Sequence, residues 1–323
     1  MHAIPLTQIG DSQVLKMVDM PTPAPAEGTA LIRVKACSVN RIDIWQRSGK
    51  YPTKLPHIMG SDCAGIIVEA NTNLPEGIQI GSEIIVNPAI SCEPSKGCSS
   101  VKIFGFNTEG AYAEYAIVPL PQIYPKPQSL TWEQAGAFPL TFLTAWHMLV
   151  SRANLKLQEK VLIFGASGGL GSSAIQIAKM LGAEVFAVTR SHDKKQALLQ
   201  IGADYVLTPD EIPSQTFDVV FDSVGTQTFN LGIKSLKPHG RLVLAGTTSG
   251  KEATLDLADL YGRELTILGA RMGTKEDFEA MYEHVKNGQL KPVIGATFPL
   301  KDASIAHKLM EDGKTLGKIV LTV

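Results

Sequence analysis

The chain has 323 residues, of which 44% are hydrophobic and 19% are charged, and its formal net charge is -1. A chain of this size and apolar content can bury enough surface for two domains. The balanced charge argues against nucleic acid or an anionic membrane as a partner, and the strand-sized apolar runs and the N-terminal sequence, which lacks an export signal, predict a cytoplasmic protein.

The first part of the chain alternates short β-rich runs with glycine and proline turns. The runs span residues 30–36, 65–69 and 83–87, and no long helix is predicted before residue 120. This pattern predicts a partly closed antiparallel β domain. Residues 119–127 contain too many prolines for a central strand or a helix, so we expect this segment to cross between two domains.

The most informative pattern spans residues 161–182. An apolar run over 161–164 leads into a glycine-dense turn over 165–171, and an amphipathic segment follows. A strand, a turn and a helix in this order cradle a pyrophosphate, because glycine lets the backbone approach closely and the helix N-terminus attracts an anion. Residues 166–171 match GxGxxG at the second and third glycines only, with Ala166 in place of the first. We predict a dinucleotide site here.

The next apolar run, over residues 184–190, predicts a second buried strand. Arg190 ends this strand, at the position about twenty residues past the turn where an acidic residue would hold a ribose 2′-hydroxyl. A guanidinium instead pairs with the 2′-phosphate of NADPH, and Lys194 and Lys195 follow within a helical turn. We therefore predict NADPH as the cofactor. The alternative is that these three cations form a solvated face.

The remaining elements complete an α/β pattern. Apolar runs over residues 218–224, 241–246 and 265–269 are typical of a parallel sheet covered on both faces, which indicates a doubly wound domain. Two further helices are predicted over 277–287 and 302–312, and a terminal strand over 318–323. Gly288 and Gly313 follow the two helices and are expected to end them.

Several motifs occur along the chain in one order. They are a VNxxD segment within 38–43, RxGxYP over 47–52, GSDCAG over 60–65, AxGGxG over 166–171 and GKIVL over 317–321. Together they resemble the medium-chain dehydrogenase/reductase superfamily, and within it the zinc-free quinone oxidoreductase branch.

The resemblance implies a domain organisation. Residues 127–269 are expected to form a Rossmann cofactor domain with a doubly wound parallel sheet. Residues 1–126 and 270–323 are expected to form a GroES-like, partly closed β-barrel domain, with the active site between the two domains. Family members commonly pair their last sheet strand across a homodimer, which would make 265–271 an interface, although any sheet would also have an apolar strand there.

The resemblance also bears on a catalytic metal. Alcohol dehydrogenases of the superfamily hold zinc with a cysteine where this chain has Asn40, and with a GHE motif where it has Gly60, Ser61 and Asp62. Amide and hydroxyl groups are poor zinc ligands beside thiolate and imidazole, so no zinc is expected. His57 lies three residues before Gly60 and is expected to pack or to face solvent rather than to bind metal.

The cysteines give no stronger indication of a metal or a disulfide. Cys92 and Cys98 resemble an eroded structural-zinc lobe, but two thiolates cannot complete a four-coordinate shell. Together with Cys37 and Cys63, they are interpreted as free thiols in a reducing compartment.

Without a Lewis acid, the substrate must itself spread the negative charge that arrives with a hydride, as a quinone or a conjugated enone does. Asn40 is predicted to donate its amide N–H to the substrate oxygen, and Tyr51 is a candidate donor or proton source. Asp43 is predicted to orient one of them, and Trp45 is a candidate wall of the pocket. Alternatively, Asn40 and Asp43 only close a turn while Tyr51 and Trp45 pack in the core.

The cofactor is assigned to residues of the predicted α/β domain that follow strands or match family positions. They are Thr141, Ala166, Ser167, Gly168, Gly169, Leu170, Gly171, Arg190, Lys194, Lys195, Val224, Gly225, Ala245, Gly246, Ala270, Arg271 and Met272.

The sequence is therefore interpreted as an NADPH-dependent quinone or enone oxidoreductase that acts on a small molecule, uses no zinc and forms a homodimer. Two other functions stay open. An enoyl-thioester reductase would need a basic groove for coenzyme A, which the β domain does not display in sequence. A nucleotide-binding protein without turnover, like the lens-crystallin relatives of this branch, would keep the cofactor turn intact.

Overall fold

The computed structural model describes residues 1–91 and 101–323, and their contacts divide the chain into two compact units. Unit 1 consists of Met1–Leu140 and Thr274–Val323, and unit 2 consists of Thr141–Gly273. None of the helices in the described residues is long and apolar enough to cross a lipid bilayer. The thiols of Cys37 and Cys63 are buried and free, whereas Cys92 and Cys98 lie outside the described residues.

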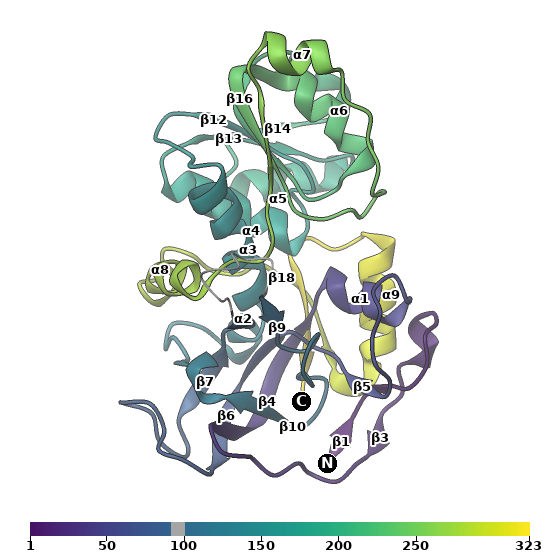
Figure 1. Ribbon diagram of the computed structural model, residues 1–323, viewed down its shortest axis with the longest axis vertical. Helices are drawn as coiled ribbons and strands as arrows, with labels where there is room; N and C mark the ends of the chain where they lie inside the picture. The colour runs from purple at the N-terminus through teal and green to yellow at the C-terminus, as the bar shows by residue number, and fades with distance from the viewer. Residues whose placement is uncertain (92–100) are drawn as a thin grey trace. The chain divides into compact units, whose positions relative to one another are not determined.

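Unit 2 contains a parallel sheet of six strands in the order β14-β13-β12-β15-β16-β17 (Figure 1). Their bounds are β12 Lys160–Ile163, β13 Glu184–Val188, β14 Tyr205–Leu207, β15 Phe217–Asp222, β16 Leu236–Leu244 and β17 Thr266–Gly269. The chain starts in the middle of the sheet at β12, builds outward to β14, and then returns to build from β15 to β17. This is the strand order of a Rossmann fold, so the prediction of a doubly wound domain is confirmed.

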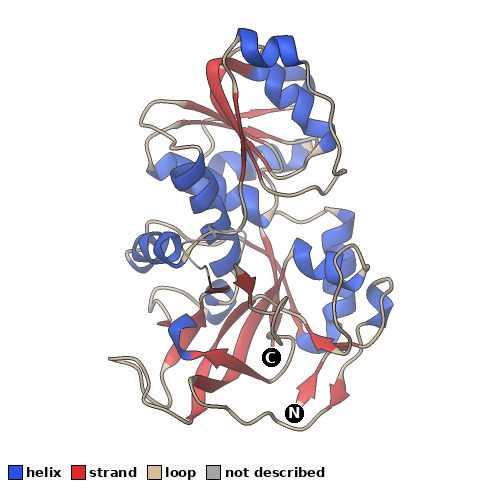
Figure 2. Ribbon diagram, viewed as in Figure 1, coloured by secondary structure: helices blue, strands red, loops and turns tan. Residues whose placement is uncertain are grey.

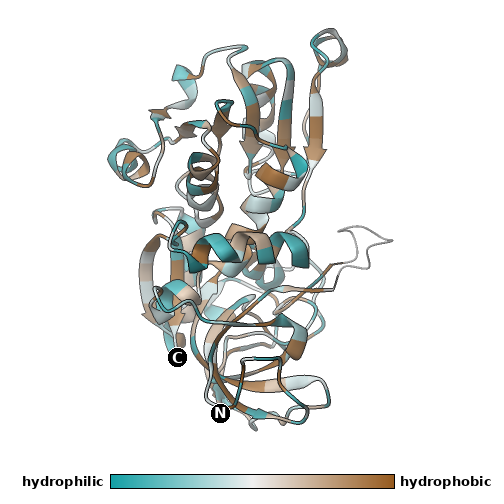
Figure 3. Ribbon diagram, turned by 90° about the vertical axis from the view of Figure 1, so that its left-hand side faces the viewer, coloured by the Kyte–Doolittle hydropathy of each residue, from teal (hydrophilic) through white to brown (hydrophobic). Residues whose placement is uncertain are grey.

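Helices lie on both sides of this sheet (Figure 2). They are α4 Gly169–Met180, α5 Lys195–Gln200, α6 Thr226–Ser235 and α7 Leu257–Gly262. Helix α3, Pro139–Trp146, spans the boundary between the units and continues as a π-helical turn over His147–Arg152. The central strands are therefore covered on both faces, and Val161, Leu162 and Ile163 of β12 are all fully buried. Figure 3 shows these strands as largely hydrophobic.

Unit 1 is built on a seven-stranded sheet in the order β11-β7-β6-β4-β19-β18, with β10 also paired to β4. The strands are β4 Thr29–Val39, β6 Asp62–Ala70, β7 Glu83–Val86, β10 Tyr115–Pro119, β11 Ile123–Pro125, β18 Ile294–Pro299 and β19 Lys318–Thr322. Pairs of shorter strands surround it: β1 His2–Ala3 with β3 Val18–Asp19, β2 Pro5–Leu6 with β5 His57–Ile58, and β8 Ala89–Ser91 with β9 Lys102–Ile103. Within the described residues of unit 1, the pairing of β18 with β19 is parallel and the other strand pairings are antiparallel.

The helices of unit 1 are α1 Arg41–Arg47, α2 Trp132–Ala135, α8 Lys275–Lys286 and α9 Ala303–Asp312. Gly313 follows α9 in the left-handed conformation, with φ 65°, and Gly288 lies just beyond α8 with φ 74°, so the predicted ends of both helices are confirmed. The C-terminal α9 and β19 lie beside the N-terminal α1 and β4 (Figure 1). Residues from the two ends of the chain therefore share one core.

Two local expectations differ from the structure. The proline-rich segment forms β11, an edge strand of the unit 1 sheet, and the chain passes to unit 2 later, after Leu140. An edge strand tolerates proline because its outer N–H groups have no sheet partner. Helix α1 is absent from the sequence-based elements, because seven residues give too few turns for a recognisable apolar period.

Candidate functional site

The turn between β12 and α4 has the geometry of a phosphate cradle. Gly165 adopts φ +69°, which reverses the chain directly after the strand. A Cβ on Gly171 would lie 2.2 Å from the carbonyl oxygen of Gly165, so only glycine lets the helix approach the strand this closely. Gly168 is the N-cap of α4 and has no side chain to cover the helix terminus. The first amides of α4 are thus presented to an anion.

A second turn lies at the neighbouring strand end, where the order of the sheet reverses. Asp222 ends β15, is fully buried, and accepts hydrogen bonds from the backbone N–H groups of Val224 (2.7 Å) and Gly225 (3.1 Å) and from the Thr228 hydroxyl. Burial raises the pKa of Asp222, and these hydrogen bonds oppose that rise. The carboxylate fixes a turn at the switch point of the sheet, where ligands of such folds bind.

The other predicted cofactor residues of unit 2 lie along the same edge or beside it. Gly246 follows β16 and Ala270 follows β17. The backbone N–H of Ala270 donates a hydrogen bond to the carbonyl oxygen of Leu244. Thr141 is buried in α3, and its hydroxyl accepts a hydrogen bond of 3.3 Å from Ser173 of α4. The structure therefore collects the glycine turn, the Val224 turn and the ends of β16 and β17 at the carboxyl edge of one sheet.

The three predicted phosphate-binding cations differ in their surroundings. Arg190 follows β13, is exposed, and makes no hydrogen bond or ion pair within residues 1–91 and 101–323. Lys195 forms an ion pair with Glu211 at 3.4 Å, which is what a solvated face would show. Partial burial lowers the pKa of Lys194. Of the three, Arg190 is the best placed to receive a phosphate.

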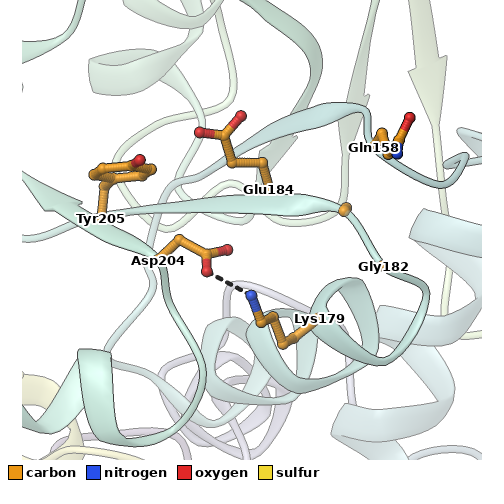
Figure 4. Close-up of a pocket in the computed structure, with 7 residues that line it drawn as sticks. Gln158, Lys179, Gly182, Glu184, Asp204 and Tyr205 are labelled. Carbon is orange, nitrogen blue, oxygen red and sulfur yellow. Dashed lines mark hydrogen bonds and ion pairs between the residues drawn. The ribbon is translucent and has the colours of Figure 1, made fainter.

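A surface pocket of about 290 Å³ occupies the opposite edge of this sheet (Figure 4). It is lined at the amino ends of β13 and β14 by Glu184 and Tyr205, and Lys179 and Asp204 form an ion pair at its wall. None of the predicted cofactor residues lines it. In parallel α/β sheets, ligands bind at the carboxyl ends of strands, so we do not assign the cofactor to this hollow.

In unit 1 the predicted residue Asn40 belongs to a buried polar cluster. Its side-chain Nδ2 donates to Asp62 Oδ2 (2.8 Å), and its Oδ1 accepts from Lys318 Nζ (2.5 Å). Asp62 Oδ2 also accepts from Lys318 (3.0 Å) and from the Ser38 hydroxyl (2.6 Å), while its Oδ1 accepts from the Leu140 N–H (2.8 Å). Sequence reasoning did not assign Lys318 to the site.

Asp43, three residues after Asn40 in the chain, belongs to a second buried polar cluster. Its Oδ2 accepts from the Asn40 backbone N–H (2.8 Å) and from the Tyr112 hydroxyl (3.1 Å), and Tyr112 also contacts His307 Nε2 at 3.0 Å. Burial raises the pKa of Asp43 to about 7, although both hydrogen bonds and Lys318 lower it. These contacts give Asp43 a structural role at the start of α1. Its role in orienting a catalytic group stays a prediction.

Tyr51 lies in a separate aromatic group. Its ring meets Trp45 and Phe106 edge-on, with centroid distances of 5.3 Å and 6.0 Å. His57 lies nearby along the chain, with Nε2 3.1 Å from the Gly105 carbonyl and Nδ1 3.7 Å from Glu109. Burial lowers the pKa of His57, but the interactions with Glu109 and Gly105 outweigh it, so the pKa is raised overall. His57 is packed, as predicted, and Tyr51 stays a predicted donor.

Comparisons with known proteins agree with both units. The family models described as "Alcohol dehydrogenase GroES-like domain" and "Zinc-binding dehydrogenase" match residues 26–128 and 169–287. A quinone oxidoreductase of Mus musculus is 31% identical, over 99% of this chain and 97% of its own length. An acryloyl-coenzyme A reductase of Sulfurisphaera tokodaii is 30% identical over 97% of each chain. A crystal structure of an NAD-dependent alcohol dehydrogenase superposes with a TM-score of 0.95 at 36% identity and covers 100% of both chains.

Proposed function

Because the chain belongs to the medium-chain dehydrogenase/reductase superfamily of oxidoreductases, we propose that it is an NADPH-dependent reductase of quinones or conjugated enones that works without a catalytic metal. The observation that carries this proposal is the side-chain chemistry at positions 40, 61 and 62. This chain has Asn40, Ser61 and Asp62 at the positions where the resemblance implies cysteine, histidine and glutamate in zinc-dependent members.

The residues at these positions do not fit a tetrahedral zinc site. Zinc sites of proteins use thiolate, imidazole and carboxylate ligands, and only Asp62 is of that kind. Asn40 Oδ1 and Asp62 Oδ2 could each face a cation, and both accept a hydrogen bond from the ammonium of Lys318. Within residues 1–91 and 101–323, no three His, Cys, Asp or Glu side chains form a group that could hold a metal. These contacts support a reaction in which no step passes through a metal.

The carboxyl edge of the unit 2 sheet fits a nicotinamide dinucleotide, the cofactor of this superfamily. The turn from Gly168 to Gly171 would hold the pyrophosphate through backbone N–H groups, and Arg190 would pair with the 2′-phosphate. When bound, NADPH supplies a hydride. The related alcohol dehydrogenase is NAD-dependent, so the proposed preference for NADPH rests on Arg190.

The protein's own groups would stabilise the charge that appears on the substrate. We assign the oxygen of a quinone or enone to the amide of Asn40, which retains one N–H hydrogen after bonding Asp62. Tyr51 remains the candidate source of the proton that completes the reduction. A conjugated acceptor spreads this charge itself, so hydrogen bonding can take the place of a Lewis acid.

The first expected result concerns substrate class. NADPH oxidation is measured by absorbance with a quinone, a conjugated enone, an enoyl-coenzyme A and a simple aldehyde, each in the presence of a chelator. We expect kcat/KM for the quinone or enone to exceed that for the aldehyde by roughly 100-fold or more, because only the conjugated acceptors need no Lewis acid.

The other outcomes separate the alternatives. A preference for the enoyl-coenzyme A would favour an enoyl-thioester reductase, which the similarity to an acryloyl-coenzyme A reductase also supports. If none of the four substrates causes NADPH oxidation while NADPH still binds, the chain is a nucleotide-binding protein without turnover. Equal activity with the simple aldehyde in the presence of the chelator would contradict the assignment to conjugated acceptors, because an unconjugated carbonyl would then also be reduced without a Lewis acid.

We also propose that the protein forms a homodimer through the free edge of β17. This strand ends the six-stranded sheet, and its Ile267 is 38% exposed, while Leu257 and Tyr261 of the neighbouring α7 are 68% and 76% exposed. An unpaired apolar edge strand is a template for pairing with a second copy.

Sedimentation velocity is expected to give twice the 34.7 kDa chain mass for the wild type. The Ile267→Lys variant is expected to sediment mainly as a monomer. Ile305→Lys is the matched control, because Ile305 is 53% exposed on α9 of unit 1. A monomeric wild type, or an equal loss of dimer in both variants, would contradict the interface.

A further inference from the structure

Lys318 is a buried cation whose hydrogen-bonding capacity is filled by three oxygens. Only 3% of the residue is exposed, and Nζ donates to Asn40 Oδ1 (2.5 Å), Asp62 Oδ2 (3.0 Å) and the Val39 carbonyl (3.3 Å). An ammonium group has three N–H donors and no acceptor, so each donor has a partner. A buried ion pair is tolerated only with such complete hydrogen bonding.

The backbone of the C-terminal segment places this side chain. Gly317 adopts φ +79°, and a Cβ there would lie 2.2 Å from the carbonyl oxygen of Val293, so the position requires glycine. Lys318 then begins β19, and the next residue, Ile319, pairs with Val39 at the end of β4. Position 318 therefore lies directly beside the strand end that carries Asn40.

The same contacts leave Asn40 a single amide orientation. The Lys318 ammonium can only donate, so it must face Oδ1, and the Asp62 carboxylate can only accept, so it must face Nδ2. A cation on the amide oxygen also withdraws electron density from the nitrogen and makes its remaining N–H a stronger donor.

We propose that Lys318 is a positioning residue for the reaction, acting as a built-in cation that orients and polarises the Asn40 amide toward the substrate oxygen. This role rests on the proposed function, in which that amide N–H stabilises the charge formed on a quinone or enone. The ammonium binds the same oxygens that a metal ion would need, and it acts on the substrate through Asn40 rather than by direct contact.

The test removes the ammonium group of Lys318 by mutation and replaces it with a small ammonium ion added to the solution. Lys318→Ala deletes the atoms that propylammonium carries, whereas tetramethylammonium has the same charge but no N–H donor. We expect kcat with the quinone or enone to fall roughly 100-fold, as for loss of an oxyanion donor, with the Kd for NADPH unchanged. Propylammonium should restore kcat at least tenfold and raise the Tm of the variant, and tetramethylammonium should do neither.

A second variant protects the test against misfolding. Lys318→Met combined with Asp62→Asn removes both buried charges, so the protein should fold and bind NADPH while kcat stays roughly 100-fold low. A kcat within threefold of the wild type in this double variant would overturn the proposal. So would propylammonium that raises the Tm of Lys318→Ala without raising kcat, because Lys318 would then be only structural.

The failure of the proposed function gives a different result. If wild type turns over no quinone or enone, the reductase assignment fails, and the positioning role fails with it. The Tm response of Lys318→Ala to propylammonium would still show whether the three oxygens form a cation site. If the wild type is active but propylammonium does not restore kcat to Lys318→Ala, the positioning role of Lys318 is rejected and the proposed function stands.

Discussion

Replacing Arg190 with glutamate is expected to lower kcat/KM for NADPH by roughly 30- to 1,000-fold and to improve the use of NADH. The side chain follows β13, is exposed and has no partner among the described residues, so it is available to a ligand. Charge-assisted hydrogen bonds to a phosphate and the new repulsion together amount to about 2–4 kcal/mol. Each 1.4 kcal/mol, roughly, is a factor of ten.

The measurement is the ratio of kcat/KM for NADPH to that for NADH in each variant. Lys156→Glu is the matched control, because Lys156 is an exposed cation of the same unit that precedes the amino end of β12. It makes the same change in charge at the opposite edge of the sheet and should leave the ratio within about threefold, since exposed charges at that distance are screened. An Arg190→Glu variant that kept its preference for NADPH would exclude the phosphate assignment.

The strand, glycine turn and helix of the candidate cofactor site in unit 2 could be predicted because their signal is local. A strand, a glycine turn and a helix follow one another within residues 160–180, and burial on both faces makes β12 a continuous apolar run. The requirement for glycine at positions 165 and 171 comes from backbone geometry within the same turn. The order of strands then brings Val224 and Gly246 to the same edge without further information.

The buried polar clusters of unit 1 were only partly predictable because their contacts join distant segments. Asn40 and Asp62 were marked by their motif positions, but Lys318 lies 256 residues beyond Asp62 and reads as an ordinary first residue of a terminal strand. The same holds for Tyr112 and His307, which meet across 195 residues. A lysine in a strand usually faces solvent, so only the tertiary fold shows that this one is buried.

The buried cluster around His307 has a consequence for stability. His307 is fully buried, its Nε2 contacts the Tyr112 hydroxyl, and its Nδ1 has no hydrogen-bond partner among the described residues. Burial, together with the smaller effect of the positive charge of Arg47, lowers the pKa of His307 to about 3. Arg47 is itself fully buried and paired with Glu311. The folded protein therefore keeps this imidazole neutral in mild acid.

Between pH 6.5 and pH 4.5, the wild type should lose roughly 2 kcal/mol of unfolding free energy that a His307→Gln variant does not lose. The unfolded chain binds a proton at this histidine below its ordinary pKa of about 6.5, whereas the folded chain does so only near pH 3. The stability that His307 contributes is therefore complete above the unfolded pKa and declines as the pH falls. Urea unfolding of both proteins at the two pH values measures the difference.

Asp43 changes the free energy of unfolding with pH in the opposite direction. The pH dependence of the wild type must therefore be compared with that of a variant. The folded pKa of Asp43, about 7, lies above the unfolded value, so its contribution is present below about pH 4 and declines as the pH rises toward 7. The two trends partly cancel in the wild type, but the difference between wild type and His307→Gln isolates the histidine. His192→Gln, at an exposed histidine of unit 2, should reproduce the pH dependence of the wild type. If His307→Gln did so as well, the imidazole would not be held neutral by burial.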